Sequence, residues 1–267
     1  PPAQASGDVV LEKGRTTLRN FRLTVGKGTM QLNAKIPGAA SMESLAVNGQ
    51  FTDFDLGWIS DVTARRFPAW GGVNGIGSGA VNLSGDTTAP SGTVTLESSS
   101  ASWKGEEFDG IDADVALEDG AVVLHKIAVR GPGLTADVRG RVANNEFRGL
   151  QIDATRFPLS VVSFPSYLLP LVSHADAHVS LEGMTSDPVV RGDFRFFRVN
   201  EERKPTGVGR GHVEGEASDL AWNLDFEGGS FRARGRVDAQ KGNLFEGSGT
   251  LKKFPVTPLL PVSAAYL

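Results

Sequence analysis

The sequence predicts an all-β fold built from many short, mostly antiparallel strands. Apolar and polar residues alternate strictly over several stretches, which is the period of a strand with one apolar and one wet face. Glycine is frequent, with 33 residues, and 14 prolines accompany it. Many Gly and Pro with few long helical runs are typical of short strands joined by turns. An internal repeat of roughly a hundred residues, longer than common solenoid repeats, predicts recurring strand units.

The alternating stretches follow one another along the chain, and turn residues separate them. The clearest strands are expected at 30–36, 111–117, 134–142, 220–226 and 231–233. The clearest turns are expected at Asp119-Gly120, Gly131-Pro132-Gly133, Gly228-Gly229 and Lys241-Gly242-Asn243. Two Phe-led segments, at 54–70 and 157–172, are the only candidates for helix, and both are short.

Several motifs occur twice or three times. Residues 80–85, followed by Pro90, return as residues 178–183, followed by Pro188, at an offset of 98 (183 − 85). Residues 11–18 return as 117–124, and 133–142 return as 228–237. A Phe-centred motif occurs at 52–56, 155–159 and 252–256. We therefore expect one continuous β fragment over residues 1–267, with approximate units 1–70, 71–172 and 173–267.

Composition narrows the function classes. The net charge of −4 provides no basic field for nucleic acid. The chain has no Cys, which removes disulfides, thiolate nucleophiles and Cys-type zinc sites. No stretch approaches the ~20 apolar residues of a membrane-spanning helix. We expect both ends of the sequence to be fragment boundaries, with targeting signals outside it.

Candidate chemical sites have simpler structural explanations. The histidines are His125, His174, His178 and His212, and their spacing does not favour metal binding. The acidic residues Glu106, Glu107, Asp109, Asp112 and Asp114 do not follow the order of a calcium loop. The Gly-rich stretch 72–85 lacks the Lys of a phosphate loop, and Ser98, Ser99 and Ser100 have no identifiable His and Asp partners. Outward arginines are expected at Arg139, Arg141, Arg234 and Arg236, where solubility explains them better than headgroup binding. We expect no enzyme activity, no cofactor and no metal.

The apolar face is the remaining candidate site. About twenty amphipathic strands present one long apolar face that the short helical candidates cannot cover, so the sheet folds onto itself or holds something apolar. Periodicity leaves both alternatives open. The same residues are therefore either a groove lining or a sandwich core. They are Val81, Leu83, Val94, Leu96, Val115, Leu117, Leu134, Val138, Val179, Leu181, Phe194, Phe196, Leu224, Phe226 and Phe231.

The order of motifs resembles the AsmA-like superfamily, and most closely the TamB family. A Gly-x-Gly strand at 77–85 precedes a Pro-x-Gly strand at 90–96, an Asp-Gly hairpin at 115–124 and a closing strand at 133–140. A segment of the Asp-Phe-Asp-Leu type, at 53–56, leads to the next unit. No single motif is specific, and the resemblance depends on their order over nearly the whole chain.

The resemblance implies a fold and a function. In that family the strands form an elongated, curved sheet, the β-taco, a U-shaped gutter whose apolar concave face is thought to carry acyl chains; short helical segments would close each repeat. It implies a periplasmic segment of a lipid-transfer protein that supports outer-membrane integrity. It also implies an inner-membrane helix elsewhere in the full protein, and possible partnership with a TamA-like outer-membrane barrel. Two alternatives are an assembly factor that holds β-strand clients of outer-membrane or autotransporter proteins, and a ligand-free β-sandwich surface module.

Overall fold

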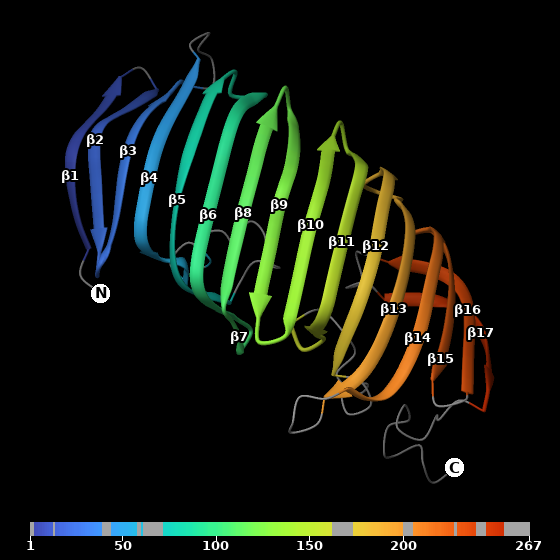
Figure 1. Ribbon diagram of the computed structural model, residues 1–267. Coiled ribbons are helices and arrows are strands. Elements are labelled where there is room, and N and C mark those ends of the chain that lie inside the picture. The colour runs from blue at the N-terminus through green and yellow to red at the C-terminus, as the bar shows by residue number, and fades with distance from the viewer. Residues whose placement is uncertain are drawn as a thin grey trace. The chain divides into compact units, whose positions relative to one another are not determined.

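The computed structural model describes residues 3–12, 14–38, 44–57, 60, 72–161, 173–199, 205–226, 229–238 and 244–253. The described chain contains 17 strands, shown in Figure 1. Their bounds are β1 Ala3–Glu12, β2 Arg15–Val25, β3 Gly28–Ile36, β4 Leu45–Asp55, β5 Val73–Gly85, β6 Pro90–Trp103, β7 Glu106–Phe108, β8 Gly110–Glu118, β9 Ala121–Gly131, β10 Leu134–Ala143, β11 Glu146–Pro158, β12 His174–Met184, β13 Val189–Val199, β14 Pro205–Glu216, β15 Asp219–Phe226, β16 Gly229–Asp238 and β17 Leu244–Lys252.

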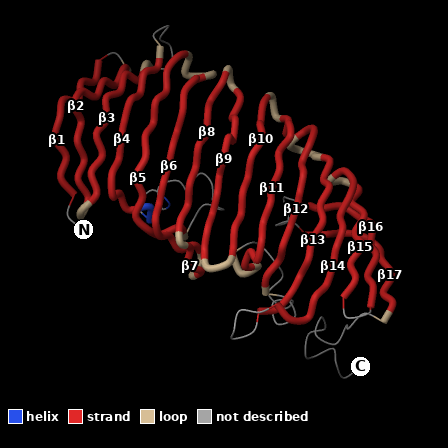
Figure 2. Tube along the Cα trace, in the orientation of Figure 1, coloured by secondary structure: helices blue, strands red, loops and turns tan. Residues whose placement is uncertain are grey.

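The predicted fold class is confirmed: the protein is all-β and antiparallel. Figure 2 shows strand throughout most of the described chain, with a short helical turn after β4. That turn includes Leu56, Gly57 and Ser60, inside the first segment predicted to be helical. In the second such segment, residues 159–161 form a turn, and residues 162–172 lie outside the described part of the chain.

The chain divides into two compact units. The first contains residues 1–132 and 138–144, and the second contains residues 133–137 and 145–267. Strand β10 is shared between them. In the first unit β1 to β6 pair in sequence order, β6 pairs with both β7 and β8, and β8 pairs with β9. In the second unit β11 to β17 pair in sequence order.

Tight turns join successive strands where the sequence supplies residues that accept a positive φ. Asp119 and Gly120, between β8 and β9, have φ values of 49° and 79°. Asn144 and Asn145, between β10 and β11, have φ values of 51° and 59°. Positive φ at both central residues is the requirement of a type I′ hairpin turn, which matches the twist of the flanking strands. The turn predicted at Asp119-Gly120 is confirmed, and the one at Lys241-Gly242-Asn243 lies outside the described residues.

The Phe-centred motif builds the same bulge in both units. Asp53 and Arg156, each directly before the motif Phe, have a φ of 51°, and the ladder shifts register at both places. The backbone N–H of Asp53 donates to Ser78 Oγ at 3.1 Å, and that of Arg156 donates to Asp176 Oδ1 at 2.8 Å. A bulge leaves a backbone group outside the ladder, so a side chain on the next strand must accept its hydrogen bond.

The motif and the residues directly after it contribute to the buried core. Phe54 and Val161 are fully buried, and Leu56 and Leu159 are nearly so. Each lies at the end of a strand group, where the chain leaves the sheet. The bulge and the residues after it therefore bury apolar side chains where the chain leaves each strand group.

Strand register repeats with the sequence. Val81 faces Val94 across β5 and β6, and Val179 faces Gly192 across β12 and β13, each residue 98 positions later. Val94 faces Val115 across β6 and β8, and Gly192 faces Val213 across β13 and β14, again 98 positions later. The division into units 1–70, 71–172 and 173–267 remains a prediction, but the facing pairs across β5, β6 and β8 have the same hydrogen-bonding register as those across β12, β13 and β14.

Candidate functional site

The apolar face of the first unit consists of continuous rows of side chains that cross the strands. Residues directly opposite each other in an antiparallel ladder point to the same face, so the register defines each row. The central row runs from β2 to β9 through Phe21, Leu32, Gly49, Val81, Val94, Val115 and Leu124. The rows on either side run through Leu18, Ala34, Val47, Leu83, Gly92, Leu117 and Val122, and through Leu23, Met30, Phe51, Gly79, Leu96, Ala113 and Ile127.

The second unit has equivalent rows. One runs from β11 to β16 through Ile152, Val179, Gly192, Val213, Trp222 and Ala233. Its neighbours run through Ala154, Ala177, Phe194, Gly211 and Leu224, and through Leu150, Leu181, Val190, Gly215 and Leu220. Phe196, two residues beyond Phe194 on β13, faces Ala175 on β12. The strand period of two places all these residues on one face.

The predicted lining residues therefore fall into two groups. Val81, Leu83, Val94, Leu96, Val115 and Leu117 share the face of the first unit, and Val179, Leu181, Phe194, Phe196 and Leu224 share that of the second. Leu134 and Val138 are on β10, and the division between the units falls between them. Phe226 is on β15 and Phe231 on β16, but their side chains lie outside the description.

These residues are half-buried rather than buried. Every predicted lining side chain that the structure describes has intermediate exposure, and none belongs to the buried core. Large residues in a closed sandwich core are usually fully excluded from water, because side chains of the opposing sheet interdigitate with them. Here the predicted lining positions retain accessible surface in both units. Other side chains of the rows are buried, namely Ala34 in the first unit and Leu150, Val213, Leu220 and Ala233 in the second.

An aromatic cluster lies on the apolar face of the second unit. The ring centroids of Phe194 and Phe196 are 5.7 Å apart and those of Phe194 and Trp222 are 6.4 Å apart, both pairs nearly parallel. Trp222 was absent from the predicted lining, although its alternation with Leu224 was visible in the sequence. Phe21, Met30, Phe51 and the other row residues of β2 to β4 were missed in the same way, because only cross-strand register assigns them to this face.

Glycines on the apolar face make room for large neighbours. A Cβ added at Gly49 would lie 2.8 Å from Leu32 Cδ1, and one at Gly79 would lie 2.6 Å from Phe51 Cζ. At Gly211 it would lie 3.0 Å from Phe196 Cε2. Large side chains therefore lean over neighbouring glycines, a close approach that any larger residue would obstruct.

The first unit also contains a hollow with a volume of about 610 Å³. It spans β2 to β6 at the level of the row through Leu18 and Leu83. The hollow is broad and open to solvent, unlike the enclosed pockets that bury most of a small molecule. Its lining combines apolar and uncharged polar residues with two basic side chains: Thr17, Leu18, Arg19, Asn33, Ala34, Lys35, Ala46, Val47, Asn48, Asn82, Leu83, Ser84, Gly92 and Thr93.

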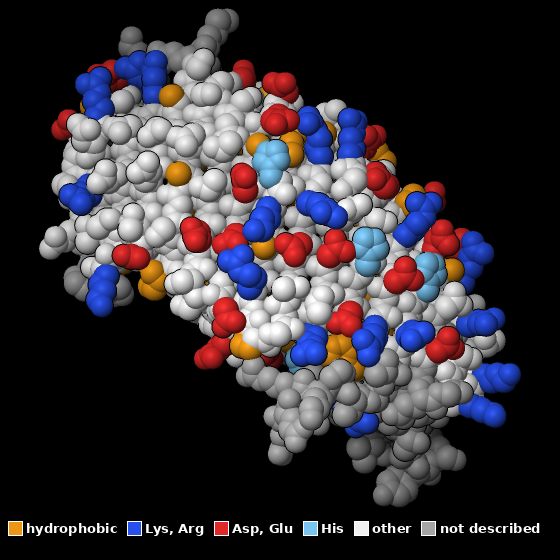
Figure 3. Space-filling view, in the orientation of Figure 1, with side chains coloured by type: hydrophobic (Ala, Val, Ile, Leu, Met, Phe, Trp, Pro, Cys, Tyr) orange, Lys and Arg blue, Asp and Glu red, His pale blue; other side chains and the backbone are white. Residues whose placement is uncertain are grey.

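The wet faces of the two units differ in charge. In the first unit, Asn33, Asn48, Asn82 and Thr93 form an uncharged row, in which Asn48 Nδ2 donates to Asn82 Oδ1. In the second unit, Asp153, His178, Asp193 and His212 alternate across four strands. In Figure 3 the surface over β2 to β6 is mostly uncharged, whereas charged side chains gather over β8 and β9 of the first unit and over the strands of the second.

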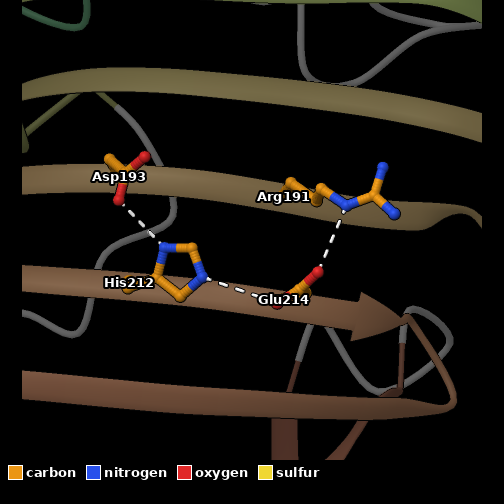
Figure 4. A network of polar contacts seen from close by, with 4 residues as sticks. All are labelled: Arg191, Asp193, His212 and Glu214. Atoms are coloured by element: carbon orange, nitrogen blue, oxygen red, sulfur yellow. Dashed lines mark hydrogen bonds and ion pairs between the residues drawn. The ribbon is translucent and has the colours of Figure 1, made fainter.

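The histidines of this charged row pair with carboxylates, as Figure 4 shows for His212. His212 Nδ1 lies 2.9 Å from Asp193 Oδ1, and its Nε2 lies 3.8 Å from Glu214 Oε2. Arg191 Nε donates to Glu214 Oε1 at 3.3 Å, and His178 pairs with Asp153. No group of three or more metal-type ligands occurs among the described residues. Across those residues, too, no helix is long and apolar enough to span a membrane.

Three of the charged residues singled out in the sequence, Asp112, Arg141 and Arg234, form ion pairs on the wet side. Asp112 Oδ2 accepts from Arg130 Nη1 at 2.5 Å and from Lys126 Nζ at 3.4 Å, and the Arg130 hydrogen bond is the main cause that lowers the pKa of Asp112. Arg141 pairs with Glu118 at 3.0 Å. Arg234 donates to both carboxylate oxygens of Asp219, which lowers the pKa of Asp219 and raises that of Arg234.

Comparison of the chain with protein-family models, with curated proteins and with solved structures gives no match. The function is therefore inferred from the chemistry of the two faces. The most unusual feature is a broad, half-buried apolar face with aliphatic rows in one unit and an aromatic cluster in the other.

Proposed function

We propose that the apolar face binds acyl chains of phospholipids, and that this chain is a segment of a periplasmic protein that carries lipid between the inner and outer membranes. One observation carries the proposal: every predicted lining side chain that the structure describes keeps accessible surface, in both units. Contiguous apolar surface of this kind is typical of a binding site for apolar ligands or partners. The resemblance to AsmA-like proteins favours acyl chains as the ligand.

The energetics of such a site favour transfer over tight retention. Burying one CH₂ group contributes roughly 0.8 kcal/mol, so two tails of about 16 carbons represent about 25 kcal/mol in water. A lipid that leaves a bilayer for the apolar face exchanges one apolar environment for another, so this term nearly cancels. The face then holds acyl chains without trapping them, as a carrier between two membranes requires.

The shape of the rows also suits flexible chains. The described residues of the three rows in the first unit are all apolar side chains or glycines, so the rows themselves supply no polar group that would orient a rigid ligand. Sites for rigid small molecules usually place a few polar groups that fix orientation. Acyl chains need only continuous apolar contact, which the rows provide across neighbouring strands.

Two further features of the full protein are proposed only from the resemblance to AsmA-like proteins. They are an inner-membrane helix in the full protein and a TamA-like outer-membrane barrel as a possible partner. The acyl-chain proposal does not depend on either, because it concerns the face of this chain.

Organic extraction of purified protein followed by mass spectrometry tests the proposal. We expect copurified phospholipid, and we expect a fluorescent fatty acid to bind in a saturable manner. Folded protein that yields no lipid and binds no fatty acid overturns the proposal. Binding of an extended peptide instead of lipid would favour the assembly-factor alternative, and binding of neither would favour the ligand-free module.

A further inference from the structure

The rings of Phe194, Phe196 and Trp222 form an aromatic platform on the apolar face of the second unit. The planes of Phe194 and Phe196 lie at 11° to each other, and those of Phe194 and Trp222 lie at 19°. Their centroids are 5.7 and 6.4 Å apart, wider than the roughly 3.5–4.0 Å at which stacked carbon atoms touch. The rings therefore do not cover each other fully, and each leaves part of its face open to a further contact.

Glycines beneath two of these rings hold them close to the sheet. A Cβ added at Gly192 would lie 3.1 Å from Cε2 and Cζ of Phe194, and one at Gly211 would lie 3.0 Å from Cε2 of Phe196. Gly192 is buried, whereas the three platform side chains are half-buried. The rings thus cover the glycine backbone and themselves keep accessible surface.

The first unit has no aromatic residue at the equivalent positions. The residues 98 positions earlier are Leu96, Ser98 and Leu124. Val115 faces Leu124 and Val213 faces Trp222, again 98 positions apart, so the equivalence holds in the sheet as well as in the sequence. Aliphatic residues are therefore sufficient to build the apolar face at Leu96 and Leu124, and the rings of the second unit add a different chemistry.

The ring orientations specify what the platform recognises. Aromatic sites for quaternary ammonium groups are cages that surround the cation with ring faces, and rings that lie at 11° and 19° to each other do not surround a ligand. Such rings instead offer offset stacking to another planar ring, which strengthens binding by about two- to tenfold beyond the contribution of buried area. A saturated chain gains only the area contribution.

We propose that the aromatic platform is a subsite for a planar, unsaturated ring carried on an apolar tail. The second unit then prefers lipids with such a ring, whereas the equivalent positions of the first unit do not distinguish them from saturated lipids. This inference rests on the proposed function, because the tail of the ligand would occupy the same apolar face as an acyl chain.

Two matched ligands test the subsite on the whole protein: ω-phenyloctanoic acid and ω-cyclohexyloctanoic acid. They have the same tail and the same number of ring carbons, and only the phenyl ring is planar and unsaturated. Displacement of a fluorescent fatty acid measures the affinity of each. The informative quantity is the ratio of the phenyl to the cyclohexyl affinity, compared between protein variants, because the difference in hydrophobicity between the two ligands is then the same in every protein.

Two variants give the platform the aliphatic residues of the first unit. Phe194→Leu and Trp222→Leu introduce the side chains found at Leu96 and Leu124, so the face stays apolar while a stacking ring is lost. We expect each to lower the affinity ratio by about threefold, within the range for one aromatic pair. Leu96→Met, at the position equivalent to Phe194, is the matched control and should leave the ratio unchanged. Circular dichroism checks that each variant is folded.

Nuclear magnetic resonance on the unsubstituted protein locates the ligand without any variant. We expect nuclear Overhauser contacts between the phenyl protons of the bound acid and the ring protons of Phe194 or Trp222. Contacts with first-unit side chains alone would overturn the subsite, as would displacement of the phenyl acid by tetramethylammonium, which would make the platform a cation site.

The remaining outcomes separate this inference from the acyl-chain proposal. If both acids bind and the affinity ratio is the same in Phe194→Leu and Trp222→Leu as in the unsubstituted protein, the subsite is overturned and acyl-chain binding stands. If neither acid binds and the fluorescent fatty acid does not bind either, both proposals fail together.

Discussion

The two units have one strand register but different side-chain chemistry. On the apolar face, Leu96 of the first unit is equivalent to Phe194 of the second. Each faces a small residue on the next strand, Ala113 and Gly211 respectively. On the wet face the first unit has a row of amides and hydroxyls, whereas the second has alternating aspartates and histidines. The backbone pattern is therefore conserved between the units while both surfaces vary.

Glycine positions illustrate how register survives such variation. Gly92 and Val94 in the first unit correspond to Val190 and Gly192 in the second, so glycine and valine exchange places between neighbouring rows. A larger side chain leans over Gly49 and Gly79 in the first unit and over Gly192 and Gly211 in the second. The exchange keeps the combined volume of these two positions while their order changes, which folded structures tolerate better than a net gain or loss.

The largest expected effect is the loss of acyl-chain binding when a carboxylate enters either apolar face. Leu83→Asp and Leu181→Asp are equivalent changes in the first and second units. A carboxylate among acyl chains loses its hydration, which costs several kcal/mol, so we expect fatty-acid binding to weaken at least tenfold. Fluorescent fatty-acid titration measures the loss, and comparison of the two variants tells which unit holds the probe.

The same variants discriminate an open face from a closed core. Asn82→Asp and Ser180→Asp place the charge one residue away on the wet face and should leave binding unchanged. If Leu83→Asp or Leu181→Asp abolishes the circular-dichroism spectrum, the residue belongs to a sealed core, and the acyl-chain proposal fails for that unit.

A smaller effect is expected from truncation of the equivalent residues Leu96 and Phe194. Phe→Ala in a sealed core costs roughly 3–5 kcal/mol, and half-burial should reduce this to about 2 kcal/mol for Phe194→Ala. Leu96→Ala, which removes less surface and no ring contact, should cost about 1 kcal/mol. Urea denaturation followed at two wavelengths measures both changes. Equal losses of unfolding free energy would mean that the ring contacts of Phe194 with Phe196 and Trp222 add no stability beyond that from buried apolar area.

The strands themselves were largely predictable from the sequence. Strict alternation located β3, β8, β10, β15 and β16, since a strand with one wet face requires period two. The hairpin at Asp119-Gly120 was predictable because few residue pairs accept positive φ at both positions. The Gly228-Gly229 turn was only partly so: Gly229 begins β16, and Gly228 lies outside the described residues.

The pairing of side chains between strands was not predictable. Trp222 joins Phe194 only because β13, β14 and β15 have the register that they do, and no local pattern specifies register across three strands. Asp112 was correctly placed on the wet face, but its partner Arg130 follows from the β8–β9 register and its bulge. Alternation in the sequence predicts which face of the sheet a residue occupies. Its contacts on neighbouring strands are determined only by the register of the assembled sheet.

The smallest expected effect concerns the ion pairs, and it sharpens the comparison of the wet faces. The folded-state pKa of Asp112 lies below its ordinary value, chiefly because of the Arg130 hydrogen bond. Its stabilising contribution is therefore fully present above the carboxyl's unfolded pKa, about 3.9, and is lost as pH falls through the lower folded-state pKa. For an accessible pair the contribution is at most about 1 kcal/mol.

Asp112→Asn should accordingly lower the free energy of unfolding by a constant amount between about pH 5 and pH 7, and the difference from the unsubstituted protein should close below about pH 4. Asp219→Asn in the second unit should also lower the free energy of unfolding, because the hydrogen bond from Arg234 lowers the pKa of Asp219 in the same way. Urea denaturation at several pH values measures both. A difference that grows toward acid would mean that the carboxylate is better stabilised in the unfolded chain than beside its arginine, which would contradict the hydrogen bonds assigned to these two pairs.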